Sequence, residues 1–272
     1  MNIEDTIKNL KLFLFDMDGT LYLGNRLFHF TKELLSEIKR SGGRYMFMTN
    51  NSSKSVKDYI IKLHKLGIEA DYSDFVTSSQ ATCHYLKKHH TNDRIYVCGT
   101  ESLKNEFKHN GLIITENPQE TDCIVLGFDT ELTFKKLHDI SLLLCTKQLP
   151  YIATNPDYVC PTEFGAVPDC GSIADILYNA TGKRPLFIGK PQPFMAELAM
   201  KMTSAQRCET AVIGDRIYTD IKSGINAGIV SMLVMSGETT EEILNASADK
   251  PDIVLENAGE ILGILKQQRP RC

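Results

Sequence analysis

Short apolar runs alternate with amphipathic helical patterns along most of this chain, and this alternation restricts the possible folds more than any other feature. The first run, residues 11–17 (KLFLFDM), is too short for a helix and ends in an acidic segment, so it indicates a buried strand of a parallel sheet. The elements predicted to follow are a helix over 30–40, a strand over 44–49, a helix capped by Ser53 and closed by Gly67, and a strand over 74–79.

The alternation resumes towards the C-terminus, where strands are predicted over 185–190, 210–215, 229–235 and 252–256. Together the two ends of the chain indicate an α/β fold whose core is a doubly wound, mostly parallel, Rossmann-like sheet. Between them lies a second alternating set, with strands predicted over 94–99, 123–128 and 151–155 and a helix over 134–147. We therefore predict a core formed by residues 1–80 and 184–272, and an inserted α/β domain over residues 81–183.

Composition and charge exclude several classes of protein. The 272 residues are 42% apolar and 24% charged, which is ordinary for a globular protein and argues against a disordered or fibrous chain. The formal net charge is -4 and no basic stripe is present, so we expect no nucleic-acid partner. The polar start of the sequence lacks the pattern of a secretory signal, and no apolar run is long enough for a membrane span, so we expect a cytoplasmic protein with no membrane partner.

The cysteines do not indicate a disulfide or zinc framework. They lie at positions 83, 98, 123, 145, 160, 170, 208 and 272, and no two form a CxxC pair. Cys98, Cys123 and Cys145 lie within apolar runs, where a reduced cysteine packs as a small hydrophobic residue. We expect them in the core.

Four clusters of polar residues each follow a predicted strand directly, at residues 16–21 (DMDGTL), 49–52 (TNNS), 189–191 (GKP) and 214–220 (GDRIYTD). Each cluster alone has an ordinary explanation, such as a turn, a helix cap or a surface lysine. In a parallel sheet, however, the carboxyl ends of the strands meet at the edge where ligands bind. The four clusters would then bring acids, a hydroxyl and a lysine to one edge.

This set of side chains suits phosphoryl transfer. A magnesium ion, Mg²⁺, prefers hard oxygen ligands, and Asp16, Asp215 and the backbone carbonyl of Asp18 supply them. Thr49 and Lys190 would neutralise the remaining oxygens of a phosphate group, because phosphoryl transfer depends mainly on positioning and charge.

As an ordered set, these motifs resemble those of the haloacid dehalogenase superfamily. The TNN form of the second motif, the stretch ATNPDYVCP at 153–161 and the GKP motif are similar to the NagD-like, p-nitrophenylphosphatase-like branch, in which a large α/β cap is inserted after the third core strand. The resemblance covers nearly the whole chain. It implies a phosphatase that hydrolyses small phosphomonoesters of the nucleotide, sugar or pyridoxal phosphate type, and p-nitrophenyl phosphate in vitro, through an aspartyl-phosphate.

The resemblance also implies a role for each motif residue. Asp16 would be the nucleophile and Asp18 the general acid and base. The other implied roles are metal binding by Asp16, Asp215 and the Asp18 carbonyl; phosphate binding by Thr49, Asn50, Asn51 and Lys190; support of the metal ligands by Asp220; and substrate selection by Asn155 and Asp157 in the cap. A homodimer is also compatible with the family.

Other functions are less consistent with the sequence. A haloacid dehalogenase needs no acid at the position of Asp18, and a phosphomutase resembles this chain less in the position of its cap. Phosphotransfer to an acceptor other than water remains open. A receiver-like signalling domain would share the acids, threonine and lysine, but such a domain is about half as long and has no inserted domain.

The predicted cap segment is acidic. Residues 148–182 contain no Lys or Arg, whereas Asp157, Glu163, Asp169 and Asp175 are acidic. A second anionic group on the substrate would find no cation here, unless these acids are solvated or cap helices, as expected of Asp175. We therefore expect nucleoside, sugar or pyridoxal monophosphates to be preferred over phosphoglycolate.

Overall fold

The computed structural model describes residues 2–162 and 164–267 of the chain. These residues form two compact units. The first comprises Met1–Thr49, Ile60–Val76 and Lys190–Cys272, and the second comprises Asn50–Tyr59 and Thr77–Gly189. Each unit is described by itself.

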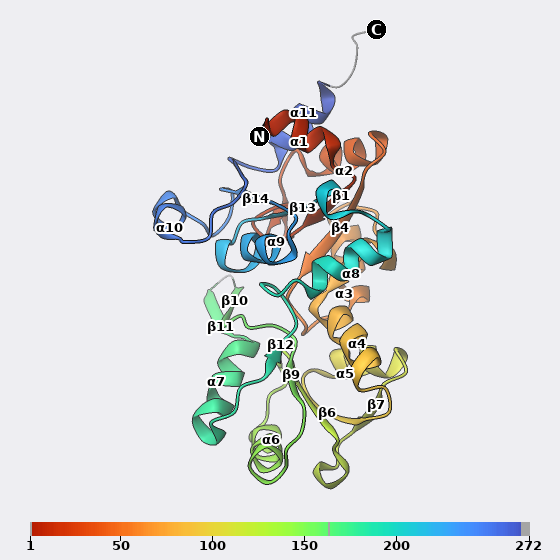
Figure 1. Cartoon of the computed structure of the whole chain (residues 1–272), viewed down its shortest axis with the longest axis vertical. Coiled ribbons are helices and arrows are strands. Elements are labelled where there is room, and N and C mark those ends of the chain that lie inside the picture. Colours follow the sequence, from red (N-terminus) through yellow and green to blue (C-terminus); the bar gives the residue numbers. More distant parts are fainter. Residues whose placement is uncertain (1, 163, 268–272) are drawn as a thin grey trace. The chain divides into compact units, whose positions relative to one another are not determined.

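The first unit is built on a six-stranded sheet whose order is β15-β14-β13-β1-β4-β5 (Figure 1). The strands are β1 (Leu12–Phe15), β4 (Arg44–Thr49), β5 (Phe75–Thr77), β13 (Thr210–Gly214), β14 (Val230–Val234) and β15 (Ile253–Leu255). The pairs that β1 makes with β13 and β4 are parallel, as are β13 with β14 and β14 with β15. All four residues of β1 are buried, because helices rather than water cover both faces of such a sheet.

The remaining elements near this sheet are helices, a short hairpin and a π-helical turn. The helices are α1 (Ile3–Asn9), α2 (Thr31–Arg40), α3 (Val56–Lys65), α8 (Phe194–Thr203), α9 (Lys222–Ala227), α10 (Glu241–Ala246) and α11 (Gly259–Lys266). A short antiparallel hairpin, β2 (Tyr22–Leu23) with β3 (Arg26–Leu27), follows β1. A π-helical turn at Ile217–Ile221 precedes α9.

The second unit has a five-stranded parallel sheet in the order β12-β9-β8-β6-β7. Its strands are β6 (Arg94–Cys98), β7 (Ile113–Thr115), β8 (Cys123–Leu126), β9 (Tyr151–Ala153) and β12 (Leu186–Phe187). Its helices are α4 (Ser78–His89), α5 (Glu101–His109), α6 (Phe134–Thr146) and α7 (Cys170–Thr181). One face of the sheet packs against α6 and α7, and an antiparallel hairpin, β10 (Val159–Thr162) with β11 (Gly165–Pro168), precedes α7.

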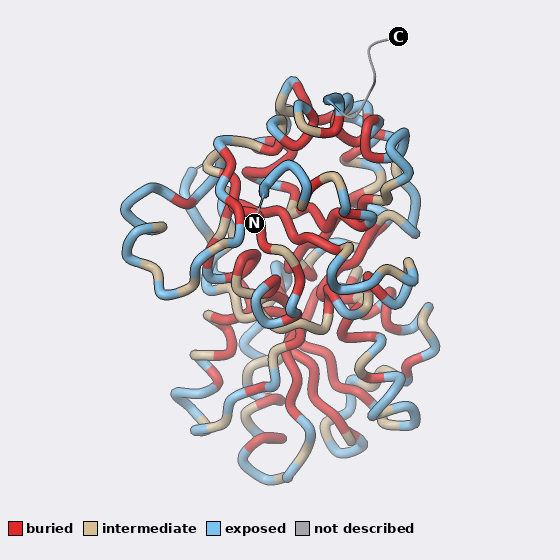
Figure 2. Tube along the Cα trace, turned by 45° about the horizontal axis from the view of Figure 1, so that its top comes forward, coloured by how far each residue is buried: buried red, intermediate tan, exposed pale blue. Residues whose placement is uncertain are grey.

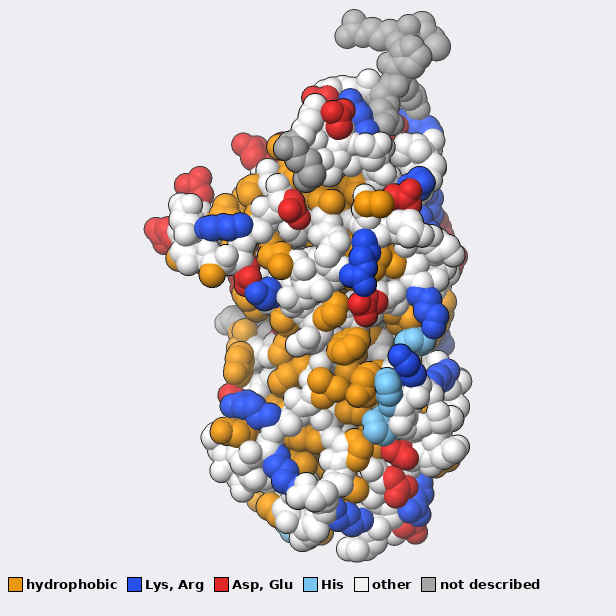
Figure 3. Space-filling model, viewed as in Figure 1, with side chains coloured by type: hydrophobic (Ala, Val, Ile, Leu, Met, Phe, Trp, Pro, Cys, Tyr) orange, Lys and Arg blue, Asp and Glu red, His pale blue; other side chains and the backbone are white. Residues whose placement is uncertain are grey.

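The predicted fold class is confirmed, since both units combine helices with mostly parallel sheets. In each unit the central strands of the parallel sheet are buried, and exposure is concentrated in the loops and the outer faces of helices (Figure 2). On the face drawn in Figure 3, Lys and Arg side chains lie among Asp and Glu and do not gather into one stripe. Among the described residues, no helix has both the length and the apolar composition that a membrane span requires.

Three local predictions are wrong. The strand predicted over 185–190 forms as β12, but it pairs with β9 in the five-stranded sheet, because an apolar run shows that a strand exists without showing its neighbour. Ser55, not Ser53, caps α3, since Asp58 accepts from the Ser55 backbone N–H at 2.8 Å and the Asp58 N–H donates back to the Ser55 hydroxyl at 3.4 Å. Cys145 is exposed, because it lies on the outer side of α6, whereas Cys98 and Cys123 are buried as expected.

Candidate active site

Three of the predicted motifs meet where the strand order of the six-stranded sheet reverses. Asp16 follows β1, Thr49 is the last residue of β4, and Asp215 follows β13. Strands β13 and β4 are the two neighbours of β1, and the Asp16 N–H donates to the Ile213 carbonyl at 2.8 Å. The carboxyl edge at such a reversal is the usual ligand position of an open α/β sheet.

The loop after β1 depends on Gly19. Its φ is +81°, and a side chain there would place a Cβ atom 2.5 Å from Oδ2 of Asp215, so only glycine permits this close approach. The Gly19 carbonyl accepts from the Ser236 hydroxyl at 2.7 Å. Asp18, one residue earlier, is exposed by its surface area, but the protein atoms around its carboxyl partly desolvate it. This desolvation raises its pKa, although the Gly24 N–H, which donates at 3.3 Å, opposes the shift. The loop thus brings Asp18 and Asp215 to the same edge.

Three carboxylates lie together at this edge. Asp16, Asp215 and Asp220 each offer an oxygen within 4.8 Å of those of the other two. Burial raises the pKa of Asp215 to about 7, and the charges of Asp16 and Asp220 add to the shift. Oδ2 of Asp215 accepts from the Glu238 N–H at 2.7 Å, whereas Oδ1 is buried and has no hydrogen-bond partner among the described residues.

Lys190 is the cation nearest to these acids in the described contacts. Its Nζ donates to Asp16 Oδ1 and to Asp220 Oδ1, both at 2.6 Å, and to the Met48 carbonyl at 3.2 Å. Burial by itself would lower the pKa of Lys190, but the two carboxylates outweigh burial and raise it, so the ammonium stays charged. Lys190 pairs with two of the three acids. Arg216, whose charge also acts on Asp215 and Asp220, pairs with Glu238 at 2.8 Å, so the site is short of positive charge.

The donor set fits Mg²⁺. The ion prefers carboxylate and carbonyl oxygens, and the buried Oδ1 of Asp215 is an acceptor that a cation would satisfy. Asp220 is fully buried, its Oδ1 accepts from Lys190, and its Oδ2 accepts from the Arg216 N–H at 3.1 Å. Both of its oxygens are therefore engaged, whereas the side chain of Asp16 is 17% exposed and accessible to a small molecule.

One contributing segment lies outside the motifs selected from the sequence. It is the loop after β14, where the Thr239 hydroxyl donates to the Asp215 carbonyl at 2.6 Å and a Cβ atom at Gly237 would lie 2.0 Å from Asp215 Oδ2. The sequence pattern could have identified this segment, because residues 236–239 (SGET) follow a predicted strand just as the four polar clusters do. The segment holds Asp215 in place from the far side of β13.

Other predicted residues belong to the second unit. The Asn50 amide donates to Asp157 at 3.0 Å, and Asn155 donates to Asp157 at 3.2 Å and to Asp169 at 3.0 Å. The Asn51 amide lies 3.9 Å from the sulfur of Cys160. Asn50, Asn155 and Asp157 thus form one hydrogen-bonded group, and Asn155 is completely buried.

The acidic cap segment is partly neutralised. Asp169, and not Asp175 as expected, caps α7, because its carboxylate accepts from the Cys170 N–H. Asp175 instead pairs with Arg184 at 2.5 Å, a cation two residues beyond the segment that lacks Lys and Arg. Glu163 lies outside the described residues.

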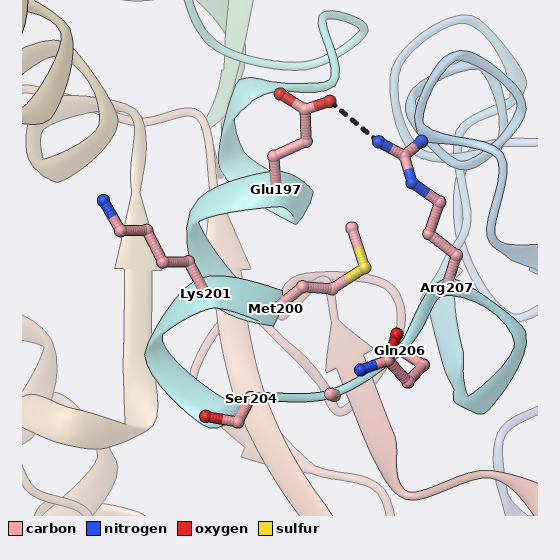
Figure 4. A pocket seen from close by; sticks show the side chains of 7 residues that line it. Glu197, Met200, Lys201, Ser204, Gln206 and Arg207 are labelled. Atoms are coloured by element: carbon pink, nitrogen blue, oxygen red, sulfur yellow. Dashed lines mark hydrogen bonds and ion pairs between the residues drawn. The ribbon is translucent and has the colours of Figure 1, made fainter.

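A pocket elsewhere in the first unit carries none of this chemistry. It is lined by residues at the end of α8 and in the loop after it, namely Glu197, Met200, Lys201, Ser204, Ala205, Gln206 and Arg207 (Figure 4). Arg207 pairs with Glu197 at 3.3 Å and also donates to the Ala227 carbonyl, so its charge is already engaged. None of the predicted site residues lines this pocket.

Comparison with known proteins identifies the family. Residues 13–113 match the model of haloacid dehalogenase-like hydrolases, and residues 187–261 match a second, related hydrolase model. The chain is similar to the 5'-nucleotidase YutF of Bacillus subtilis, with 34% identity over 93% of this chain and 98% of that protein. Among solved structures it is similar to a 4-nitrophenylphosphatase from Thermotoga maritima, with 40% identity, a TM-score of 0.91, and coverage of 95% of this chain and 98% of that one.

A third similar protein was solved with a metal ion. It is a glycerol phosphate phosphatase from Mycobacterium tuberculosis in complex with magnesium, with 28% identity, a TM-score of 0.86, and coverage of 94% of this chain and 77% of that one. The structural likeness extends to a protein described as a putative nagD protein, at 38% identity and a TM-score of 0.87. The chain belongs to the haloacid dehalogenase-like hydrolases, as a phosphatase of their NagD-like, p-nitrophenylphosphatase-like branch.

Proposed function

We propose that this protein is a Mg²⁺-dependent phosphatase of small phosphomonoesters in which Asp16 is the nucleophile. The observation that supports it most is the acidic cluster of Asp16, Asp215 and Asp220, two members of which pair with the buried Lys190. Asp16 is the partly exposed member, while Asp220 is enclosed. The reacting carboxylate must reach a substrate, so this difference favours Asp16.

The proposed reaction has two steps. A carboxylate oxygen of Asp16 attacks the phosphorus atom, the bond to the leaving oxygen breaks, and Asp18 gives that oxygen a proton. A water molecule then attacks the phosphorus of the aspartyl-phosphate and gives a proton to Asp18, which frees Asp16 and inorganic phosphate. Lys190, which donates to Asp16 at 2.6 Å, orients that carboxylate.

The residues proposed to hold Mg²⁺ are Asp16, Asp215 and the backbone carbonyl of Asp18, and the bound ion would neutralise charge on the phosphate oxygens. Asp220 would support the site by fixing Lys190 and the turn at Arg216. Thr49, Asn50 and Asn51 are proposed to bind the phosphate group together with Lys190.

We propose that the first unit acts as the catalytic core and the second as the cap. The boundaries predicted from the sequence, 1–80 with 184–272 and 81–183, stay a prediction, as does a homodimer. A cytoplasmic location is also proposed, and the seven cysteines among the described residues, all free thiols, fit a reducing compartment.

For the substrate class, we propose monophosphates whose leaving group carries no second anionic group, such as nucleoside, sugar and pyridoxal phosphates. Asp157 and Asn155 would face this leaving group through the hydrogen-bonded group that includes Asn50. A carboxylate about 6 Å from Asp157 would be disfavoured by roughly 3 kcal/mol at an effective dielectric constant near 20. The compared proteins named for nucleotides, 4-nitrophenyl phosphate and glycerol phosphate act on leaving groups of this kind.

Trapping the phosphorylated enzyme tests the mechanism. With radiolabelled substrate and an acid quench, Asp18→Asn should accumulate label on the protein, because water is no longer activated, and Asp16→Asn should carry none. Label on Asp16→Asn would contradict the role of Asp16. Many phosphates released per wild-type enzyme would separate an enzyme from a receiver-like switch, which consumes about one.

A panel of phosphomonoesters at matched Mg²⁺ concentration and ionic strength tests the substrate class. Specificity constants should rank nucleoside, sugar and pyridoxal monophosphates above phosphoglycolate. If phosphoglycolate has the highest value, the argument from the acidic cap is wrong.

A further inference from the structure

A second group of potential metal ligands lies in the second unit, apart from the residues assigned to phosphate chemistry. Helix α4 ends at His89, and the following loop of residues 90–93 leads directly into β6. Strand β8 is a parallel neighbour of β6, with Ile95 in register with Cys123. The loop residues His90 and Asp93 therefore meet Cys123 at the amino ends of two strands.

The geometry is compact. His90, Asp93 and Cys123 each offer one ligand atom within 4.8 Å of the other two, and His90 Nδ1 lies 2.8 Å from Asp93 Oδ2. The bond lengths of tetrahedral zinc place its donor atoms about 3.3–3.7 Å apart. A tetrahedral ion would therefore replace the hydrogen bond between His90 and Asp93 and hold the three donor atoms at these separations.

Burial distinguishes this group from an ordinary surface ion pair. The side chains of His90 and Asp93 are 15% and 33% exposed, and Cys123 is fully buried. Solvent therefore reaches the group through His90 and Asp93, where a water molecule could serve as a fourth ligand.

The charges around Cys123 favour a cation. Burial, together with the nearby carboxylates of Asp93 and Asp122, raises the pKa of its thiol to about 12. A thiol in such surroundings stays protonated when no metal is present. A bound divalent ion would favour the thiolate over the thiol, because the same carboxylates attract the ion and the ion stabilises the thiolate.

We propose that His90, Asp93 and Cys123 form a metal site for Zn²⁺ or a similar transition-metal ion. The nitrogen, oxygen and sulfur donors suit zinc and disfavour Mg²⁺, which takes oxygen ligands. The site ties the loop after α4 to β8 and is separate in residues and in chemistry from the Asp16, Asp215 and Asp220 cluster. Two of its ligands come from a loop and the third from a strand thirty residues later, so spacing rules for zinc motifs do not reveal it.

Cobalt provides the test, because a thiolate bound to Co²⁺ gives an intense near-ultraviolet charge-transfer absorption that oxygen ligands do not. The full-length protein, with excess Mg²⁺ present to fill the oxygen-ligand cluster, should bind one equivalent of Co²⁺ with this absorption, and Zn²⁺ should displace it. Cys123→Ala should abolish the band, while Cys83→Ala, which changes another buried cysteine of the same unit, should keep it. His90→Gln should weaken Zn²⁺ binding by at least about 100-fold, more than loss of an outer partner does, while His89→Gln should not.

Circular dichroism of each variant establishes that it is folded before titration. The proposal is overturned if the wild-type protein shows no thiolate absorption with Co²⁺. It is equally overturned if the folded Cys123→Ala variant keeps the absorption, since the ion would then be bound by an exposed cysteine such as Cys145 or Cys208. In either case His90 and Asp93 are only a loop ion pair beside a core cysteine.

Discussion

Both parallel sheets place acidic side chains just beyond the carboxyl ends of central strands, but the partners of those acids differ. In the six-stranded sheet, Asp16 and Asp215 follow β1 and β13 and form a cluster with Asp220, and Lys190 pairs with Asp16 and Asp220. In the five-stranded sheet, Asp129 follows β8 and has its own cation, Lys136, at 2.7 Å. The side chain of Asp129 is completely buried, yet its charge is balanced.

The hydrogen bonds show the same difference. Asp129 also accepts from the Glu131 N–H at 2.9 Å, and Lys136 also donates to the Gly99 carbonyl at 3.1 Å. By contrast, the buried Oδ1 of Asp215 has no partner among the residues described. A buried acid without a matching cation is unfavourable for folding, so its presence at a ligand-binding edge indicates that something else supplies the charge. The comparison therefore separates a structural acid from a functional one.

The largest effect is expected from Asp16→Asn. The amide preserves volume but is not a nucleophile, so kcat should fall by at least about 10⁴-fold while the protein stays folded. Phosphate release and circular dichroism measure the two properties. Activity within tenfold of wild type would show that Asp16 is not the nucleophile, and the acids of the six-stranded sheet would no longer differ in function from Asp129.

Asp18→Asn should lower kcat by about 10²–10⁴-fold, the range for general acid and base catalysis. Its affinity for Mg²⁺ should stay close to that of wild type, because the backbone carbonyl of residue 18 is the proposed ligand.

Asp215→Asn should instead weaken Mg²⁺ binding strongly, and wild type in excess chelator should be inactive until Mg²⁺ is restored. Isothermal titration of Mg²⁺ into each variant decides, and equal loss of affinity in Asp18→Asn and Asp215→Asn would contradict this division of roles.

Asp129→Asn tests the balanced acid of the second sheet. Removing one partner of a buried ion pair destabilises a protein by about 3 kcal/mol or more, so the urea midpoint should fall, while kcat of the folded fraction stays unchanged. The double variant Asp129→Asn with Lys136→Met should recover much of the loss, because no charge remains unpaired. A large loss of kcat in folded Asp129→Asn would mean that the acids of both edges are functional.

Much of this arrangement follows from the sequence, because each functional side chain is next to a buried strand. The runs at 44–49 and 210–215 form β4 and β13 almost as predicted, and strand adjacency then brings Thr49 and Asp215 to β1. Sequence patterns do not determine which sheet a two-residue strand joins, as β12 shows, or which of two serines caps a helix. They also do not reveal pairings across long separations, such as the hydrogen bond between Asn50 and Asp157.

Glu106 in α5 differs from Asp129, the balanced acid of the second unit, and its substitution gives the smallest expected effect. Its Oε1 is buried without a hydrogen-bond partner among the described residues, and it lies within α5 rather than at the end of a strand. Burial raises its pKa from 4.5 to about 7, and the charge of Asp58 adds to the shift. Substituting Glu106 therefore tests whether a buried acid without a matching cation is functional even when it lies away from a ligand-binding edge.

The sign of its pH dependence follows from the raised pKa. Below about pH 4.5 the carboxyl is protonated in both the folded and the unfolded protein, so it has no effect on the free energy of unfolding. Between about pH 4.5 and 7 the unfolded state loses the proton first, so stability falls as pH rises, by up to about 3 kcal/mol in total. Glu106→Gln removes this titration. The difference in unfolding free energy between variant and wild type should therefore grow in favour of the variant from pH 4.5 to pH 8, while kcat is unchanged, as urea unfolding and phosphate release at each pH will measure. A constant difference across this range would show that Glu106 is ionised in the folded protein, and a loss of kcat would extend the functional acids beyond the edge of the first sheet.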